Sequence, residues 1–314
     1  MSKIKTLKSE LRRRAINGGG GHGTIEKRLC TIEMFCAWLE QENRQIRKIR
    51  NRDLRDFIAD RKQCGFAIGT LQNLASHLRN VENSVSFSNQ EIGAFGRCRA
   101  GTGCAISDPD YFRCLDRVEN DGVRAAAQLQ RFLGLRALEA IESGRSLSHW
   151  IWALERGQLL RVIHGTKGGK LRALEVPDPV GSLRVVSEAI EVSRKQGGQT
   201  VRGWNGSLKS AINRYFYYMR KAGFTGKLSP HSLRYAYAAE MVLFYRRQGM
   251  SVREALATVA LCLGHGDGRG SYVRRVYLQG SEHVLDPDLD VEDNRAWRPT
   301  SCTTEYEGRI ILSS

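Results

Sequence analysis

The chain has 314 residues with 49 lysines and arginines against 33 aspartates and glutamates, so its formal net charge is +16 at pH 7. No run of 18 apolar residues occurs, which excludes a hydrophobic membrane-spanning helix, and no two of the eight cysteines form a C-x-x-C pair, which argues against a zinc site or a disulfide framework. The basic excess is +9 over residues 1–104 and +7 over the rest, which indicates a polyanionic partner for both halves.

The N-terminal third is expected to hold a basic arm followed by a small helical domain. Residues 1–23 are basic and end in a glycine run that cannot hold a helix, so they are predicted to be a flexible arm. From Thr24 onward, apolar residues recur at three- and four-residue steps, and further helical stretches follow near 54–61 and 70–85. Residues 24–104 are therefore predicted to form a helical domain. An ordinary helical bundle with a charged outer face has the same pattern.

The remainder, residues 105–314, is expected to be a larger domain with a C-terminal tail. The helical pattern weakens before the turn at Ser107-Asp108-Pro109, which places the boundary there. Apolar runs flank a glycine-rich turn at 165–170 and predict a β-hairpin over 159–176. Helical patterns cover 111–119, 122–132, 205–222, 231–248 and 251–262. The predicted fold class is therefore mainly α with a small β-sheet.

Two short motifs in this larger domain carry basic residues at special backbone positions. The first is Gly134-Leu135-Arg136 with Glu139 three residues later, where one helix ends and the next begins. The second is Lys167, which lies between glycines at the tip of the predicted hairpin and can extend its ammonium group outward. Each motif alone is common on solvated protein surfaces.

Two later motifs are more specific. In Ser229-Pro230-His231-Ser232-Leu233-Arg234, the proline favours a helix start, which places His231 and Arg234 on one face of the opening turn. Such a helix end suits the oxygens of a phosphate, although a core histidine beside a surface arginine is the alternative. In Leu263-Gly264-His265 the glycine ends a helix beside the histidine, and the hydroxyl of the nearby Tyr277 offers a nucleophile.

Taken in order, these motifs resemble the tyrosine recombinase family, which includes the phage integrases. The resemblance covers roughly residues 108–280, and the basic helices at 24–100 are similar, with less specific motifs, to the family's core-binding domain. It implies a helical core-type DNA-binding domain followed by a catalytic domain of the DNA breaking-rejoining fold. The implied activity is that of a site-specific recombinase or integrase of a mobile genetic element.

The resemblance also implies a role for each residue of the motifs. Arg136 and Arg234 would clamp the phosphate oxygens, and His231 and His265 would add hydrogen bonds, with His231 a candidate base. Lys167 would protonate the leaving 5'-hydroxyl, and Tyr277 would attack to form a 3'-phosphotyrosine. Glu139 would orient a basic partner, and no metal or other cofactor is implied.

The spacing before the tyrosine departs from the family pattern. Family members usually carry the nucleophile about nine residues after the histidine of the L-G-H motif, and that position here is Arg274. Tyr272 and Tyr277 are the neighbouring candidates, and the glycine-rich run 266–270 looks like a small insertion that favours Tyr277.

The implied partner is double-stranded DNA, and a homotetramer is expected to bind two DNA sites. The protein is expected to be cytoplasmic and to have no membrane partner. A type IB topoisomerase uses the same chemistry and is the nearest alternative, and a DNA-binding relative without catalysis is another. The apolar end of the chain, Arg309–Leu312, is expected to dock either on a neighbouring protomer or on its own domain.

Overall fold

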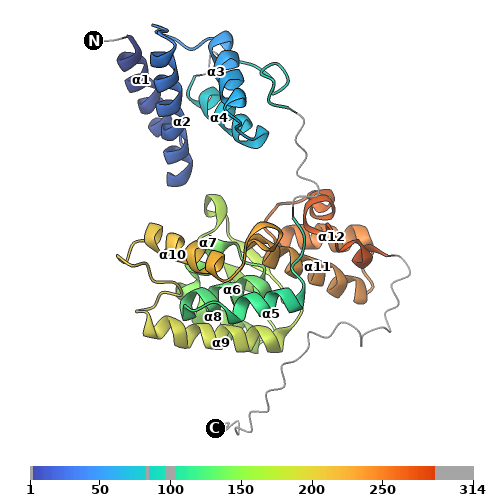
Figure 1. The fold of residues 1–314 in the computed structure, drawn as a ribbon. Helices are drawn as coiled ribbons and strands as arrows, with labels where there is room; N and C mark the ends of the chain where they lie inside the picture. The colour runs from blue at the N-terminus through green and yellow to red at the C-terminus, as the bar shows by residue number, and fades with distance from the viewer. Residues whose placement is uncertain (1–2, 83–84, 96–102, 287–314) are drawn as a thin grey trace. The chain divides into compact units, whose positions relative to one another are not determined.

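The computed structural model describes residues 3–82, 85–95 and 103–286, and the chain divides into two compact units, residues 1–99 and 100–314 (Figure 1). The division lies five residues before the boundary predicted at 104 and 105. Helices dominate the described residues, and their one sheet has two strands, so the predicted fold class is confirmed. No described helix is long and apolar enough to span a membrane. The predicted docking segment, Arg309–Leu312, lies outside the described residues.

The first unit is a bundle of helices around an aromatic centre. The rings of Phe35 and Trp38 both contact Phe57, with centroids 5.2 and 5.5 Å away, and all three side chains are buried. Arg44 lies over Trp38, with its guanidinium carbon 4.8 Å from the ring centroid. The helices of its described part are α1 (Lys3–Asn17), α2 (His22–Gln41), α3 (Asn51–Gln63) and α4 (Ile68–Val81).

The prediction of a flexible arm over residues 1–23 is wrong for residues 3–17, which form α1. Four apolar side chains at three- and four-residue steps, Ile4, Leu7, Leu11 and Ala15, are buried in the core of the first unit. α1 packs against α2 and α4, and Glu33 of α2 pairs with two basic residues of α1. The glycine run does interrupt helical structure, but it separates two packed helices. In the sequence, lysines and arginines surround these apolar residues, which makes the stripe hard to recognise.

If α1 belongs to the core, Leu11→Ala should lower the free energy of unfolding by about 2–5 kcal/mol, because it leaves a cavity where a fully buried leucine was. Urea-induced unfolding followed by circular dichroism measures this. Arg13→Ala, at an exposed position of the same helix, is the matched control and should change it by less than about 0.5 kcal/mol. Equal small effects for both variants would show that α1 contributes nothing to the core.

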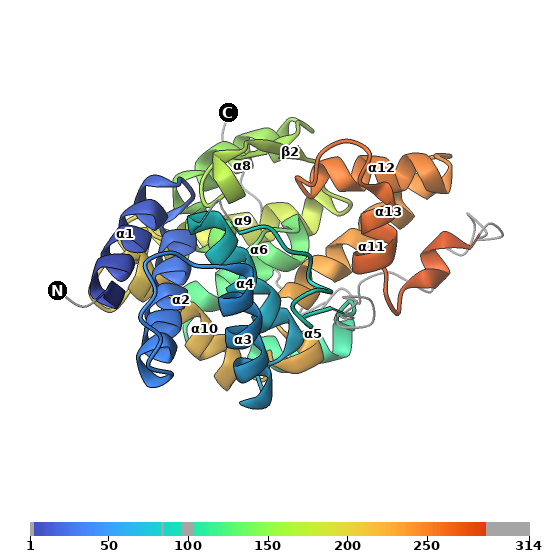
Figure 2. The ribbon, with the colours of Figure 1, turned by 90° about the horizontal axis from the view of Figure 1, so that it is seen from above.

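The second unit is built around α11 (His231–Arg247), which is buried on nearly all sides from Ser232 to Tyr245. Such a helix lies in the middle of a core. α12 (Val252–Cys262) and α6 (Asp121–Leu133) pack against it, and α11, α12 and α13 (Gly270–Tyr272) lie together in Figure 2. The other α-helices of its described part are α5 (Asp108–Asp116), α7 (Ala137–Ile141), α8 (Leu147–Glu155), α9 (Pro179–Lys195) and α10 (Leu208–Lys221).

The predicted hairpin is present and is shorter than expected. β1 (Leu160–Val162) and β2 (Arg172–Leu174) pair antiparallel, with Leu160 opposite Leu174 and Val162 opposite Arg172. Leu160, Val162 and Leu174 are buried, and Trp150 of α8 donates a hydrogen bond of 2.8 Å to the carbonyl of Arg161. The connecting loop contains a short 3-10 turn that begins at Lys167. This lysine therefore lies on an exposed loop above a strand pair anchored in the core.

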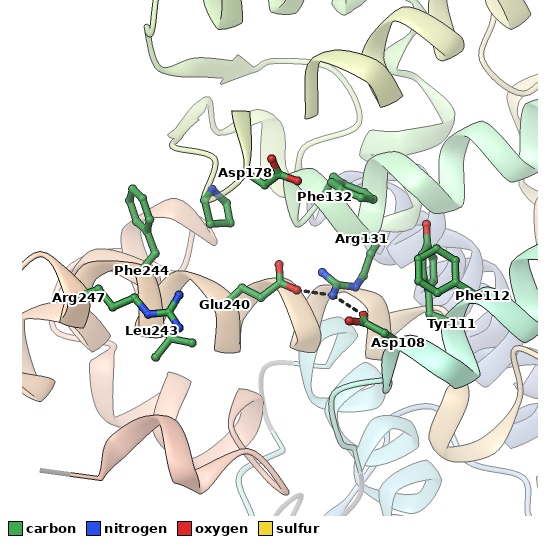
Figure 3. Close-up of a pocket in the computed structure, with 11 residues that line it drawn as sticks. Asp108, Tyr111, Phe112, Arg131, Phe132, Asp178, Glu240, Leu243, Phe244 and Arg247 are labelled. Atoms are coloured by element: carbon green, nitrogen blue, oxygen red, sulfur yellow. Dashed lines mark hydrogen bonds and ion pairs between the residues drawn. The ribbon is translucent and has the colours of Figure 1, made fainter. Parts of the chain in front are cut away.

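A buried charge cluster ties α5, α6 and α11 together beside a hollow of about 140 Å³ (Figure 3). Arg131 of α6 is 5% exposed and pairs with Asp108 at 2.9 Å and with Glu240. A buried arginine without partners would be costly, and the two carboxylates compensate its charge. Aromatic side chains, including Phe132 and Phe244, are among the other residues that line the hollow.

Candidate active site

Two arginines far apart in the sequence converge on one backbone carbonyl. Arg136 precedes α7, where Glu139 accepts a hydrogen bond from its backbone and another from its side chain, each 2.7 Å long. Its second guanidinium nitrogen donates to the carbonyl of Leu263 at 3.0 Å. Arg234, in the first turn of α11, donates to the same carbonyl and to that of Gly134. The structure therefore brings the two predicted clamp residues together.

The helix carrying Arg234 starts close to where the sequence placed it. α11 begins at His231, the first residue of the predicted helical pattern, with Pro230 in the N-cap position and no side-chain cap. His231 is exposed, whereas Arg234, one turn on, is fully buried. The ring of His231 still packs against that of Tyr235, with centroids 4.8 Å apart, so the opening turn places a histidine at the edge of the site and an arginine inside it.

Tyr277 lies beside the same cluster. Its hydroxyl is 2.8 Å from Nε2 of His265 and accepts a hydrogen bond of 3.4 Å from Nε of Arg234. It ends a π-helical turn, Val273–Tyr277, and the residue is 2% exposed. π-turns are rare and are frequently found at functional sites. A phenol within hydrogen-bond distance of an imidazole and a guanidinium is a suitable nucleophile.

The other candidate tyrosine also lies near His265. The ring of Tyr272 is 5.0 Å from the imidazole of His265 and 6.2 Å from the ring of Tyr277, centroid to centroid. The spacing favours Tyr277 with Tyr272 as the alternative, and the hydrogen bonds to His265 and Arg234 are made by Tyr277. This geometry supports Tyr277 as the nucleophile.

Both histidines of the cluster are held in the neutral form. Desolvation first, and then the positive charges of Arg234 and Arg136, lower the pKa of His231 and of His265 to about 4. The ring of His231 is 5.9 Å from that of Tyr277, centroid to centroid, whereas His265 makes the hydrogen bond. His231 was expected to be the candidate base, but the structure places His265 in that contact. A neutral imidazole with its proton on Nδ1 can accept a hydrogen bond from the Tyr277 hydroxyl through Nε2.

Lys167 is the one predicted residue outside this contact network. It is exposed at the start of the hairpin turn, and no contact among the described residues joins it to the cluster. Within the same described part of the chain, no group of three or more His, Cys, Asp or Glu side chains is arranged to hold a metal ion. The cluster is thus cationic and aromatic, with Glu139 as its buried carboxylate.

Two family models match the chain. The model described as the N-terminal part of phage integrase matches residues 1–85, and the model described as integrase matches residues 93–240. The chain belongs to the tyrosine recombinase, or phage integrase, family. The integrase match includes Arg136, Lys167, His231 and Arg234, and it ends before His265 and Tyr277. The last two positions are therefore supported by the geometry of the site.

Two solved structures show the same fold as this integrase. The XerH site-specific recombinase bound to a palindromic difH substrate is 14% identical with a TM-score of 0.55, and the match covers 90% of this chain and 94% of that one. The Tn1549 transposon integrase in complex with transposon right end DNA is 15% identical with a TM-score of 0.53, over 88% of this chain and 95% of that one. No curated protein sequence matches significantly.

Arg172 is a member of the integrase site that the motifs did not indicate. Its side chain is 3% exposed and pairs with Glu139 at 2.7 Å. Burial by itself would raise the pKa of Glu139, but Arg172, Arg234 and the backbone N–H of Arg136 outweigh it and hold that pKa at about 2. One signal could have indicated Arg172: it shares a strand face with the buried Leu174, where an apolar residue is usual.

The site should make the stability of this integrase fall in acid. His265 has a pKa of about 4 when folded and 6.5 when unfolded, so the unfolded chain binds the proton first and stability falls as pH drops from 6.5 to 4. Glu139, with a pKa of about 2 against 4.5, adds stability above pH 4.5 that is lost as pH falls toward 2. Urea unfolding at pH 7.5, 6, 5 and 4 should therefore give steadily smaller free energies of unfolding.

His265→Gln should make this dependence shallower between pH 6.5 and 4, because it removes one titrating group while His231, whose pKa is also lowered to about 4, remains. His283→Gln changes an exposed histidine and is the control, for which the wild-type slope is expected. A wild-type slope in His265→Gln would mean that the fold does not depress the pKa of His265.

Proposed function

We propose that the protein is a site-specific DNA recombinase that cleaves and rejoins duplex DNA through a 3'-phosphotyrosine intermediate. One observation carries the proposal: the hydroxyl of Tyr277 contacts His265 and Arg234, and Arg234 shares the carbonyl of Leu263 with Arg136. The fold shared with the XerH recombinase and the Tn1549 integrase, both solved with DNA, supports it.

The two arginines are proposed to hold the non-bridging oxygens of the scissile phosphate. A phosphodiester is negatively charged, and attack by an oxygen nucleophile builds more charge on those oxygens. The side chain of Arg136 is 23% exposed and can therefore reach a bound phosphate. Arg234 is fully buried and lies next to Tyr277. Guanidinium groups suit this role because their planar donors match two phosphate oxygens at once. His231, at the exposed edge of the site, would donate one more hydrogen bond to the phosphate.

The proposed reaction is a direct exchange of ester bonds. The hydroxyl oxygen of Tyr277 bonds to phosphorus, and its proton passes to Nε2 of His265. The bond between phosphorus and the 5'-oxygen breaks, and this oxygen takes a proton from the ammonium group of Lys167, whose exposed turn would lie against the DNA. Because the phosphotyrosine keeps the ester bond energy, the 5'-hydroxyl of another strand can reverse the steps without a nucleotide cofactor.

A bound phosphate would also make His265 a better base. In the free protein the charges of Arg234 and Arg136 help to lower the pKa of His265 to about 4. The phosphate adds negative charge next to both arginines and so offsets their effect on the imidazole. His265 would then gain proton affinity at the stage of the reaction that needs it.

The proposed partner is duplex DNA bound by four protomers on two sites, since recombination exchanges strands between two duplexes. The first unit would be the core-type DNA-binding domain and the second the catalytic domain. With a net charge of +16, the chain should bind DNA mainly through phosphates, so affinity should fall steeply as salt rises.

Covalent trapping tests the proposal. Nicked duplexes that copy candidate junctions of the parent mobile element would be incubated with the protein, and adducts that survive denaturation would be isolated and sequenced. We expect an adduct on a specific junction and strand exchange with a second duplex carrying it. Relaxation of supercoiled DNA without exchange would instead indicate a type IB topoisomerase, and specific binding without an adduct would indicate a DNA-binding relative.

A further inference from the structure

The hairpin that carries Lys167 is too small to fix its own orientation. β1 and β2 have three residues each, and an isolated two-stranded hairpin is marginally stable in water. The position of the hairpin therefore depends on its contacts with the surrounding helices. Arg172 of β2 pairs with Val162 across the strands and, unlike the lysine on the loop, points into the core.

The guanidinium of Arg172 binds three separate parts of the site. It contacts both carboxylate oxygens of Glu139, at 2.7 and 3.4 Å, at the start of α7. It donates to the carbonyl of Gly134 at 3.2 Å, where α6 ends, and to the carbonyl of Cys262, where α12 ends. These are the segments that carry Arg136 and His265.

Arg172 and the two clamp arginines also share their acceptors. Glu139 binds the side chains of both Arg172 and Arg136. The carbonyl of Gly134 accepts hydrogen bonds from both Arg172 and Arg234. The hairpin and the clamp are therefore attached to the same acceptors, which sets the place of the hairpin relative to the clamp.

Close packing leaves little room for the hairpin to tilt. At Gly264, where φ is +67°, an added Cβ would lie 2.9 Å from Cδ of Arg172. At Gly165, in the hairpin loop, an added Cβ would lie 2.5 Å from the carbonyl oxygen of Leu138 in α7. The hairpin thus rests directly on the backbone of the segments that bear the clamp.

We infer that Arg172 is a positioning residue that holds the Lys167 hairpin at a fixed distance from the phosphate clamp. The inference rests on the proposed function, in which Lys167 protonates the leaving oxygen. Proton transfer requires the ammonium group within hydrogen-bond distance of that oxygen, so a small tilt of the hairpin reduces the rate without changing the clamp residues themselves. Among the described residues, the hydrogen bonds of Arg172 go to Glu139 and to two backbone carbonyls. Unlike those of Arg234, none reaches the hydroxyl of Tyr277, so Arg172 acts through the lysine.

A change of leaving group separates this role from a general structural one. In a duplex with sulfur in place of the 5'-bridging oxygen, the leaving group is a thiol with a pKa of about 8.5, so it departs without an acid. Cleavage of the sulfur duplex should therefore not need Lys167. The substrate would be the nicked junction captured with the wild-type protein, prepared in oxygen and sulfur forms, and single-turnover cleavage would be measured at saturating protein.

We expect Arg172→Met to slow cleavage of the oxygen duplex by about 10²-fold or more and that of the sulfur duplex by less than about 10-fold. Lys167→Ala should show the same pattern, and Arg172→Lys an intermediate loss with the same recovery on sulfur. Lys170→Met, at an exposed position of the same loop, is the control and should cleave both duplexes like the wild type.

Equal losses on both duplexes would overturn the inference, because they would mean that Arg172 only supports the fold or the clamp. An unchanged rate on the oxygen duplex would overturn it as well. If thermal unfolding shows that Arg172→Met does not fold, the ratio of oxygen to sulfur rates in Arg172→Lys decides by the same criteria. If the wild-type protein formed no adduct, the proposed function itself would be wrong, and this inference would fail with it.

Discussion

Tyr277→Phe should abolish the covalent adduct on a nicked duplex, whereas Tyr272→Phe should keep it. Removing the hydroxyl removes the atom that bonds to phosphorus, so adduct formation should fall by at least about 10³-fold. The hydroxyl of Tyr277 is the one that lies 2.8 Å from His265 and accepts from Arg234. Denaturing gel electrophoresis of labelled DNA after single-turnover reaction measures the adduct directly.

Tyr277→Phe separates the effect of losing the hydroxyl from the effect of losing the packing of the ring. The ring of Tyr277 packs edge-on against Tyr235, with centroids 4.9 Å apart, and a phenylalanine keeps this contact. Thermal unfolding and DNA affinity of Tyr277→Phe should therefore stay near the wild type. An adduct formed by Tyr277→Phe but absent with Tyr272→Phe would make Tyr272 the nucleophile.

The parts of the site predicted from sequence are those encoded by local backbone signals. The glycine of Gly134-Leu135-Arg136 does end α6, in the left-handed conformation with φ of +57°, and Arg136 does begin α7. His231 and Arg234 do lie in the first turn of a helix. Each of these positions depends on a few neighbouring residues, so a short motif is enough to predict it.

Contacts between distant segments were not predictable in the same way. Arg172 binds Glu139 and the carbonyl of Cys262, which are 33 and 90 positions away in the chain, and nothing near Arg172 specifies either partner. The π-helical turn that ends at Tyr277 is also not predicted by a period of 3.6 residues. α1 is different, because its buried residues follow three- and four-residue steps that are present in the sequence itself.

Arg234→Lys should have the second largest effect, a loss of about 10²- to 10³-fold in single-turnover cleavage. Arg234 donates from three different nitrogens, to the carbonyls of Gly134 and Leu263 and to the hydroxyl of Tyr277. A lysine has one nitrogen at the end of a flexible chain and cannot occupy all three directions. Burial, and then the charge of Arg172, lower the pKa of Arg234 to about 10, so the guanidinium remains charged at pH 7.

Affinity for DNA distinguishes positioning of the transition state from simple attraction of the phosphate. Arg234→Lys keeps the charge, and Arg234 is 0% exposed, so binding of the nicked duplex should change by less than about 10-fold. Arg117→Lys, the same change at an exposed position after α5, is the control for both rate and affinity. A fall in affinity as large as the fall in rate would mean that Arg234 contributes to ground-state binding. A loss in rate alone means that its fixed geometry acts only when charge develops on the phosphate, as the proposed mechanism requires.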